Sequence, residues 1–250
     1  MSGWVGDFTM KELKLGKEAK AVDGASMFQK SWSIYGALSE KNYMHHREIY
    51  AQVEEWLGKR SGEPYSILDL GCGNARFLAP CLQKHQPSMY LGVDLSPAAL
   101  EEAKEHLKGL LHVALRQEEM VEALERSKSR FEVIFSGYAM HHLDSVTKEK
   151  FLSHCFQRLV PGGGMLLVDI VRQEGQTREE YIRKYLEFMR QDWTEVPREE
   201  LEEACTHVQA CDFPETESSM WEMGKKAGFA TIERLTRFGP HQLFEFGKAE

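Results

Sequence analysis

A short apolar run that breaks into a glycine turn and resumes as a helix constrains this chain most. Residues 66–78 read Ser-Ile-Leu-Asp-Leu-Gly-Cys-Gly-Asn-Ala-Arg-Phe-Leu. Ile67, Leu68 and Leu70 predict a buried strand. The turn at 71–73 brings backbone N–H groups and a helix N-terminus towards a ligand without Cβ atoms in the way. The pattern therefore predicts a ligand site at a junction of strand, turn and helix.

The turn suits a nucleoside ligand that has no diphosphate. It lacks the Gly-Lys-Ser/Thr ending of a phosphate-binding P-loop. A dinucleotide site needs a third glycine or alanine for close helix packing beside a pyrophosphate, and Arg76 holds that position. Asp69 adds a carboxylate at the strand end, which favours a ligand that carries positive charge nearby.

A second acidic residue ends the next predicted strand. Residues 90–95 read Tyr-Leu-Gly-Val-Asp-Leu, and Asp94 follows Asp69 by 25 residues. An acidic residue at the tip of the second strand of a βαβ unit is placed to accept hydrogen bonds from ribose hydroxyls. The two motifs together predict one nucleoside site.

The chain resembles class I S-adenosylmethionine (SAM)-dependent methyltransferases. The resemblance is carried by Leu-Asp-Leu-Gly-Cys-Gly at 68–73, Gly-Val-Asp-Leu-Ser at 92–96 and Arg-Leu-Val-Pro-Gly-Gly-Gly at 158–164. It covers roughly residues 50–170 and, more loosely, the C-terminus. It implies SAM as cofactor, S-adenosylhomocysteine as product and a small-molecule acceptor whose methylated atom (N, O or S) stays open.

The resemblance also implies the residues of the cofactor site. Asp69 and the glycine turn would hold the methionine end of SAM, Asp94 the ribose, and Ser136 would contribute backbone near the sulfonium. An acidic residue after the third strand would accept the adenine amino hydrogens. Glu118 fits that role best, although one sequence does not fix the register and an acid-rich helix N-terminus is the alternative. The complete predicted set is Asp69, Gly71, Cys72, Gly73, Asp94, Leu95, Gln117, Glu118, Glu119 and Ser136.

Strands alternate with helices along the chain, which predicts a doubly wound, mostly parallel α/β sheet. The resemblance implies seven strands in a Rossmann-like order, with the seventh antiparallel to the rest. Residues 171–215 read as two helices after the fifth strand, and we expect a helical cap over the acceptor pocket there. We treat the chain as one methyltransferase domain: an N-terminal arm and helices (1–57), the SAM-binding core (58–170), the cap insertion (171–215) and a C-terminal helix with the last two strands (216–250).

Local signals place the individual elements. Ser96 is the predicted N-cap of the helix after Asp94, and Thr177-x-x-Glu180 is a capping box. Apolar spacing also predicts a helix before the first strand. Further predictions are a helix near 74–85, strands over 111–115 and 165–170, a helix that opens at Pro214, and strands over 230–235 and 242–246.

The loop after the fourth strand holds the candidate catalytic residues. Residues 137–144 read Gly-Tyr-Ala-Met-His-His-Leu-Asp and are expected at the carboxyl edge of the sheet. His141 and His142 are candidate general bases, since neutral imidazole can take a proton from a hydroxyl, thiol or ammonium. Tyr138 is a candidate polar orienter. The alternative for either histidine is that it caps the following helix or meets a backbone carbonyl.

Aromatic residues near the N-terminus are candidate substrate contacts. Trp32, Tyr35 and Tyr43 lie among small polar residues, where they would close over a ligand or pack the arm onto the core.

Two features bear on the type of acceptor. Ser136 stands where base-amino methyltransferases carry an Asn/Asp-Pro-Pro-Tyr/Phe run and where metal-dependent catechol-type enzymes need a carboxylate, so we predict no metal. Eight acidic residues between 195 and 217 stand against Arg198. If they lined the pocket they would favour a cationic acceptor, while a solvated helix face is the alternative.

The composition narrows the class of protein. The 250 residues are 42% hydrophobic, which suits one α/β domain with insertions. The net charge of −8, without a dominant basic cluster, disfavours a nucleic-acid partner. Five cysteines without a Cys-x-x-Cys pair indicate reduced thiols in a cytoplasmic protein. Neither a signal peptide nor a membrane span is expected.

Two other functions stay open. A non-catalytic SAM-binding regulatory or scaffold subunit would bind the cofactor without turnover. An NAD(P)-dependent oxidoreductase is weakened by Arg76 at the third glycine position. The oligomeric state also stays open.

Overall fold

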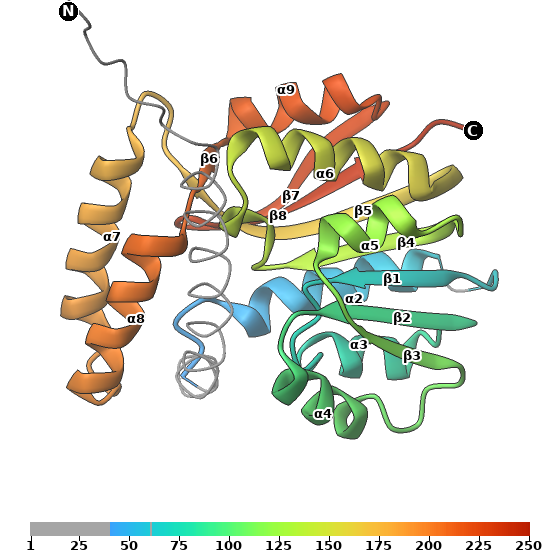
Figure 1. Ribbon diagram of the computed structural model, residues 1–250, viewed down its shortest axis with the longest axis horizontal. Helices are drawn as coiled ribbons and strands as arrows, with labels where there is room; N and C mark the ends of the chain where they lie inside the picture. Colours follow the sequence, from blue (N-terminus) through green and yellow to red (C-terminus); the bar gives the residue numbers. More distant parts are fainter. Residues whose placement is uncertain (1–40, 61) are drawn as a thin grey trace, which may run out of the picture.

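The computed structural model describes residues 41–60 and 62–250, which form a twisted sheet with helices on both faces (Figure 1). The strands are β1 (Ser66–Leu70), β2 (Met89–Asp94), β3 (Val113–Gln117), β4 (Phe131–Gly137), β5 (Leu159–Arg172), β6 (Glu215–Thr216), β7 (Thr231–Phe238) and β8 (His241–Gly247). The helices are α2 (His46–Lys59), α3 (Leu78–Lys84), α4 (Pro97–His106), α5 (Met120–Arg126), the short 3₁₀ helix η1 (Met140–His142), α6 (Ser145–Arg158), α7 (Arg178–Asp192), α8 (Arg198–Cys211) and α9 (Glu217–Ala227).

The strand order is β3-β2-β1-β4-β5-β8-β7, and the two-residue β6 pairs with β5 off this path. The pairs from β3 through to β5 are parallel, whereas β8 runs antiparallel to both β5 and β7. This confirms the predicted doubly wound sheet and its antiparallel last strand. The order reverses between β1 and β4, which is where open α/β sheets bind ligands, beyond the carboxyl ends of the strands.

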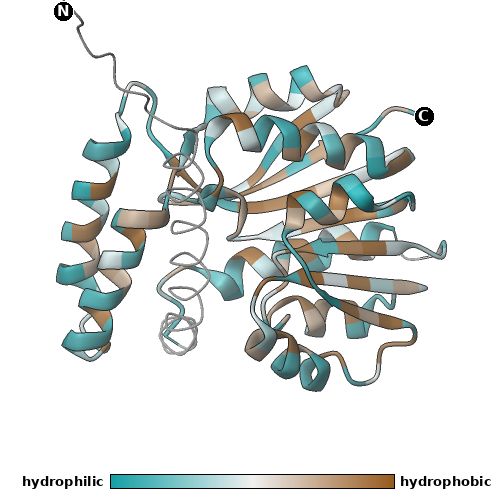
Figure 2. Cartoon of the chain, in the orientation of Figure 1, coloured by the Kyte–Doolittle hydropathy of each residue, from teal (hydrophilic) through white to brown (hydrophobic). Residues whose placement is uncertain are grey.

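Alternating side chains divide the core between the two faces of the sheet. Ile67 and Val133 belong to the apolar cluster that includes α2 and α3, while Leu68 and Ile134 belong to the cluster that includes α5 and α6. All four are fully or almost fully buried, and each such side chain contributes about 1.5–3 kcal/mol of transfer free energy. Figure 2 shows the hydrophobic residues concentrated in these central strands.

Helices α7 and α8 follow β5 and lie beside the sheet, on the left of Figure 1. The predicted capping box begins α7, with Thr177 Oγ1 accepting from Glu180 N and the Glu180 side chain accepting from Thr177 N. Tyr181, Tyr185 and Met189 from α7 join the same apolar cluster as Val168 of β5. The pair of helices is therefore packed against the carboxyl end of the sheet.

One predicted helix and one predicted strand begin later in the structure than the sequence pattern indicated. The helix predicted near 74–85 begins only at Leu78, because Ala75 has φ 55° and Asn74 Oδ1 accepts a hydrogen bond from Arg76 N. The strand predicted over 111–115 spans 113–117, because Tyr90 of β2 pairs with Val113.

Two boundaries also differ near the C-terminal half of the sheet. The strand predicted over 165–170 extends in both directions to Leu159–Arg172, since Leu159 already pairs with Phe131. The helix predicted from Pro214 begins at Glu217, because the two preceding residues pair with β5 and Thr216 caps the helix. The predicted N-cap Ser96 is confirmed, with Oγ accepting from Ala99 N.

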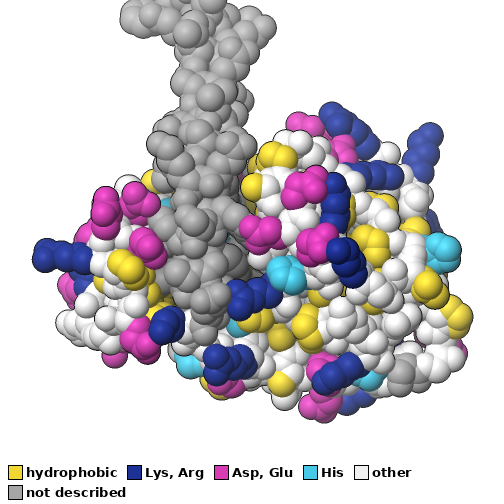
Figure 3. All heavy atoms as spheres, turned by 90° about the horizontal axis from the view of Figure 1, so that it is seen from below, with side chains coloured by type: hydrophobic (Ala, Val, Ile, Leu, Met, Phe, Trp, Pro, Cys, Tyr) yellow, Lys and Arg dark blue, Asp and Glu magenta, His cyan; other side chains and the backbone are white. Residues whose placement is uncertain are grey.

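Two surface properties belong to the described residues. No helix among them is both long enough and apolar enough to span a bilayer. On the face shown in Figure 3, the visible Lys and Arg side chains are interspersed with Asp and Glu.

Candidate active site

A cavity of about 420 Å³ lies where the order of the strands reverses. Its wall comes from the turns that follow β1, β2, β3 and β4, and from α7, α8 and the segment after α8. The turns after β1 to β3 form one end, which we call the nucleoside end. Residues of η1, α7 and α8 form the other, which we call the acceptor end.

The glycine turn shapes the nucleoside end. Gly71 and Gly73 have φ values of 71° and 50°, a region that costs other residues about 1–2 kcal/mol. Gly71 N and Cys72 N both donate to Val93 O, at 2.9 and 3.0 Å. A Cβ on Gly71 would overlap the Cβ of Ala139 in the loop after β4. The two loops at the reversal point therefore touch only because position 71 has no side chain.

Asp94 organises the next part of the wall. Its Oδ2 accepts from Gly73 N and its Oδ1 from Ser96 N, both at 2.8 Å. Burial raises the pKa of Asp94, although these two backbone donors favour the charged form. Each carboxylate oxygen has a second lone pair. Asp94 can thus hold the turn in place and still accept from hydroxyl groups in the cavity.

Asp69 is a buried carboxyl group in the wall of the cavity. Tyr90 Oη donates to its Oδ2 at 2.7 Å, and Oδ1 has no hydrogen-bond partner among the described residues. Burial raises the pKa of Asp69 to about 7, against the opposing effect of the Tyr90 hydrogen bond. An unpartnered buried carboxylate oxygen is costly unless a donor meets it, so the position fits a cationic group of a ligand.

The three candidates at 117–119 have different surroundings. Glu118 lines the cavity, and its Oε1 accepts from Arg126 Nη1 at 2.7 Å. Glu119 also lines it, but its side chain accepts from two backbone N–H groups of α5, so it serves as the helix cap. Gln117 is absent from the wall and donates to Leu95 O at 3.3 Å. Ser136 is fully buried behind the wall, with Oγ donating to Leu70 O at 2.9 Å.

The three catalytic candidates come together at the acceptor end. Tyr138 Oη donates to Met44 O at 2.6 Å. His141 Nδ1 donates to Asp169 Oδ1. His142 Nδ1 lies 3.2 Å from Cys211 O, which resembles the alternative of a histidine that meets a carbonyl. Burial lowers the pKa of His141, but the neighbouring carboxylates of Asp169 and Asp212 outweigh it and hold the pKa above its ordinary value.

The aromatic substrate candidates are not in the described wall of the cavity. Trp32 and Tyr35 lie outside the described residues. Tyr43 stacks on Trp193 with ring centroids 5.3 Å apart, and its hydroxyl accepts from Glu195 N at 3.1 Å. Trp193 lines the cavity whereas Tyr43 packs behind it. This matches the packing alternative for Tyr43.

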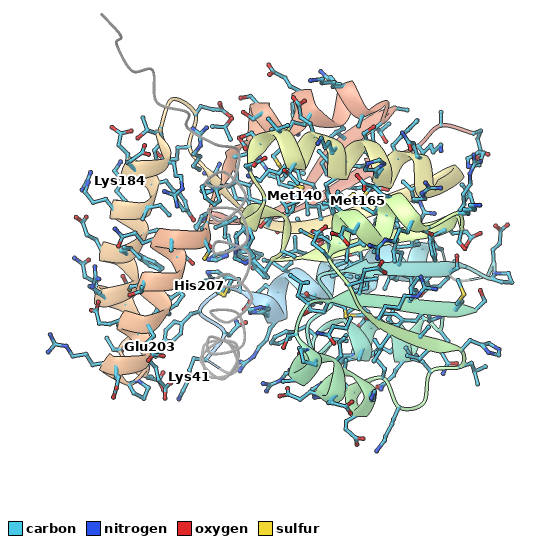
Figure 4. The ribbon with its side chains drawn as sticks, viewed as in Figure 1. Lys41, Met140, Met165, Lys184, Glu203 and His207 are labelled. Atoms are coloured by element: carbon cyan, nitrogen blue, oxygen red, sulfur yellow. The ribbon has the colours of Figure 1, made fainter. Side chains whose placement is uncertain are left out.

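Sequence reasoning did not include in the predicted site the residues that α7, α8 and the following segment place in the wall. Their signals were the spacing of apolar residues on the two predicted helices, a histidine in the insertion that could line the pocket (His207), and the run of acidic residues that includes Asp212. Figure 4 labels one of them, His207 on α8. The residues in question are Tyr185, Met189, Trp193, Ala204, His207, Val208 and Asp212.

Half of the eight acidic residues between 195 and 217 form ion pairs away from the wall. Of those eight, Asp212 is the one found among the lining residues of the described cavity. Four others pair with basic side chains: Glu195 with Lys41, Glu202 with Arg190, Glu215 with Lys148 and Glu217 with Arg234. This arrangement removes most of the argument for a cationic acceptor.

Comparison with known proteins finds a methyltransferase domain and similar enzymes. Residues 67–163 match the family model of a methyltransferase domain. A carboxy-S-adenosyl-L-methionine synthase from Trichodesmium erythraeum is 26% identical over 204 residues, 80% of this chain and 79% of the relative. The mitochondrial ubiquinone biosynthesis O-methyltransferase of Saccharomyces cerevisiae is 28% identical over 130 residues, 51% of this chain and 40% of the relative.

A solved structure extends the likeness of fold to most of the chain. Magnesium protoporphyrin IX methyltransferase from Synechocystis, determined with bound SAH, has a TM-score of 0.62 and 14% sequence identity. The similarity covers 90% of this chain and 97% of that one.

Proposed function

Since this chain belongs to the class I SAM-dependent methyltransferases, we propose that it transfers the methyl group of SAM to a small-molecule acceptor. The single observation that supports this proposal is the cavity of about 420 Å³ that joins the nucleoside end to a wall built by α7 and α8. The side chains that α7 and α8 add to the wall of the cavity support a small acceptor.

The residues at the nucleoside end fit SAM. The unpartnered Oδ1 of Asp69 suits the ammonium of the methionine part, and the remaining lone pairs of Asp94 suit the ribose hydroxyls. The glycines admit the ligand close to the backbone. When bound, SAM supplies an electrophilic methyl group on its sulfonium.

The residues at the acceptor end orient a second ligand and exclude water. Tyr185, Met189 and Trp193 present large, buried side chains from α7 and its C-terminal end. A dry, shaped wall holds reacting groups in line and protects them from hydrolysis. His141 and His142 lie at this end, and a role for either as general base stays a prediction.

Calorimetric titration of the full chain tests the proposal. We expect micromolar binding of both SAM and S-adenosylhomocysteine, followed by turnover with a member of a panel of small amines, phenols and thiols. Binding of both without turnover on any acceptor would favour a regulatory SAM-binding subunit. Binding of a nicotinamide cofactor without SAM would overturn the assignment.

Replacing Asp94 by alanine is expected to weaken SAM binding by about 1.5–3 kcal/mol, roughly 10- to 150-fold, because hydrogen bonds to a charged group are lost. The measurement is calorimetric titration. Asp144→Ala is the matched control, since Asp144 also accepts from a backbone N–H, as the N-cap of α6, but lies outside the lining of the cavity. Unchanged SAM affinity in the Asp94 variant would contradict the ribose assignment.

The affinity for SAM is expected to fall several-fold between about pH 7.5 and pH 6. The Asp69 pKa of about 7 means that the carboxylate, which attracts the SAM ammonium, becomes protonated in this range. For the stability of the unliganded protein the sign is opposite. The raised pKa of Asp69 in the folded state stabilises the fold when the pH lies below the pKa of the unfolded state, and this stabilisation is lost as the pH rises to about 7. Asp69→Asn should flatten the affinity profile, and an unchanged profile would contradict the role of Asp69.

One observation favours a second candidate function. The relative that aligns with 80% of this chain is named a carboxy-S-adenosyl-L-methionine synthase, a name that describes a modified form of SAM. Arg76 is a cation in the wall of the cavity, where it would attract a carboxylate. Mass spectrometry separates the two functions: methyl transfer yields S-adenosylhomocysteine, whereas a synthase yields an S-adenosyl product heavier than SAM.

A further inference from the structure

We propose that His141, His142 and Asp212 bind a divalent transition-metal ion at the acceptor end of the cavity. Each residue offers one ligand atom, and the three atoms lie within 4.8 Å of one another. All three residues line the cavity. Two imidazoles and one carboxylate form a ligand set that suits zinc or iron(II) and leaves further coordination positions open.

The distances are close to those of a coordinated ion. His141 Nε2 lies 3.7 Å and His142 Nδ1 lies 3.4 Å from the same oxygen, Oδ1 of Asp212. A tetrahedral ion with bonds of about 2.0–2.2 Å holds its ligand atoms roughly 3.4 Å apart. Small rotations of the side chains would bring the three ligand atoms around one ion, with His142 Nδ1 turning away from Cys211 O.

The buried Asp212 carboxylate faces both histidines without a hydrogen bond to its Oδ1 from the described residues, which is a second sign of a ligand between them. Asp212 is 4% exposed, and its Oδ1 accepts no hydrogen bond from the described part of the chain. Burial of an unsatisfied carboxylate oxygen costs free energy, which a bound cation would offset. The oxygen that lacks a hydrogen bond is the one that both histidines approach.

The surroundings hold the ligands in place. Asp169 accepts from Nδ1 of His141, which fixes the ring and leaves Nε2 towards Asp212, the usual arrangement of a carboxylate behind a metal-bound histidine. Phe213 N donates to His141 O at 2.8 Å and ties the segment that carries Asp212 to η1. Two distant parts of the chain are thereby joined at the site.

This site differs from the catechol-type metal site, which needs a carboxylate at the position of Ser136. That prediction of no metal considered a catechol-type site, in which the loop after the fourth strand supplies the carboxylate. Here Asp212 supplies it from 70 residues further along the chain, a distance at which no spacing rule applies. As ligands, the two histidines would not serve as general bases.

The open positions of such an ion would face the cavity and bind an oxygen or sulfur atom. A bound metal lowers the pKa of a coordinated hydroxyl or thiol. This part of the inference rests on the proposed function: it narrows the acceptor class to compounds with a hydroxyl or thiol. The metal site itself does not depend on methyl transfer.

The test uses the full chain, treated with a chelator and then titrated with Zn²⁺ by calorimetry, with Co²⁺ as a spectroscopic probe. We expect one Zn²⁺ per chain and visible d–d bands of a low-symmetry Co²⁺ site. Asp212→Asn should weaken Zn²⁺ binding at least about 100-fold, and Asp169→Asn about 10- to 100-fold. Far-UV circular dichroism checks that each variant is folded.

His154→Gln is the matched control, since His154 also lies near a carboxylate, Glu125 at 3.6 Å, but on α6 outside the lining of the cavity. It should leave Zn²⁺ binding unchanged. Zn²⁺ binding that Asp212→Asn does not weaken, or no binding in the native chain, would overturn the proposal and indicate an imidazolium of His141 between two carboxylates instead. SAM titrated separately distinguishes this failure from failure of the proposed function.

Discussion

Replacing Gly71 by alanine is expected to abolish measurable SAM binding and to lower the free energy of unfolding by about 2–5 kcal/mol. The φ of 71° costs an L-residue about 1–2 kcal/mol. The new Cβ would also overlap the Cβ of Ala139, and such overpacking costs about 1–3 kcal/mol. Because both loops line the cavity, the displacement that relieves the overlap changes the binding site itself. Calorimetry and denaturant unfolding measure the two effects.

Two further variants separate strain from overlap. Gly175 has a similar φ of 74°, but nothing lies within 4 Å of a Cβ placed there, so Gly175→Ala has the backbone strain alone. Ala139→Gly in the Gly71→Ala background removes the overlap and should recover the difference. Equal losses of stability in the two single variants would show that the contact between the loops contributes nothing.

Replacing Lys148 by methionine is expected to lower the free energy of unfolding by about 3–5 kcal/mol. Lys148 is fully buried on α6, and its Nζ donates to Phe213 O and, at 3.1 Å, to Glu215 Oε1. Removal of the cation leaves the carboxylate of Glu215 buried without its counter-charge. Denaturant unfolding should show a lower midpoint with an unchanged slope.

A double variant and a surface variant test the reason for this loss. Lys148→Met combined with Glu215→Gln removes both charges and should recover much of the stability. Lys226→Met breaks an exposed ion pair with Glu149, at 2.5 Å, and should change stability little. If the surface variant lost as much as Lys148→Met, burial of the charge would not be the cause.

The sequence predicted the nucleoside end of the cavity because its residues sit at strand ends and turns. The glycine turn and Asp94 follow their strands directly, so local pattern alone places them at one edge of a parallel sheet. Their interlocking was not predictable: Asp94 accepting from Gly73 N depends on the register between β1 and β2. The start of β3 likewise depends on its register with β2, in which Tyr90 pairs with Val113.

The acceptor end was predicted only in part because distant segments build it. His141 and His142 come from the loop after β4, but Asp212 reaches them through the packing of α7 and α8. Helical spacing identified the apolar faces of α7 and α8 without saying what each faced. Trp193 illustrates this: it ends α7, is 2% exposed, and contacts both Tyr43 and the cavity.

The position of β8 between β5 and β7 has a consequence for biosynthesis. β8 follows β7 in the chain, yet it supplies every backbone pairing of β7 within the described sheet. Until residues 241–247 are available to pair, β5 therefore presents an unpaired edge. Exposed edges recruit other chains, so the nascent protein passes through a stage at which aggregation competes with completion of the sheet.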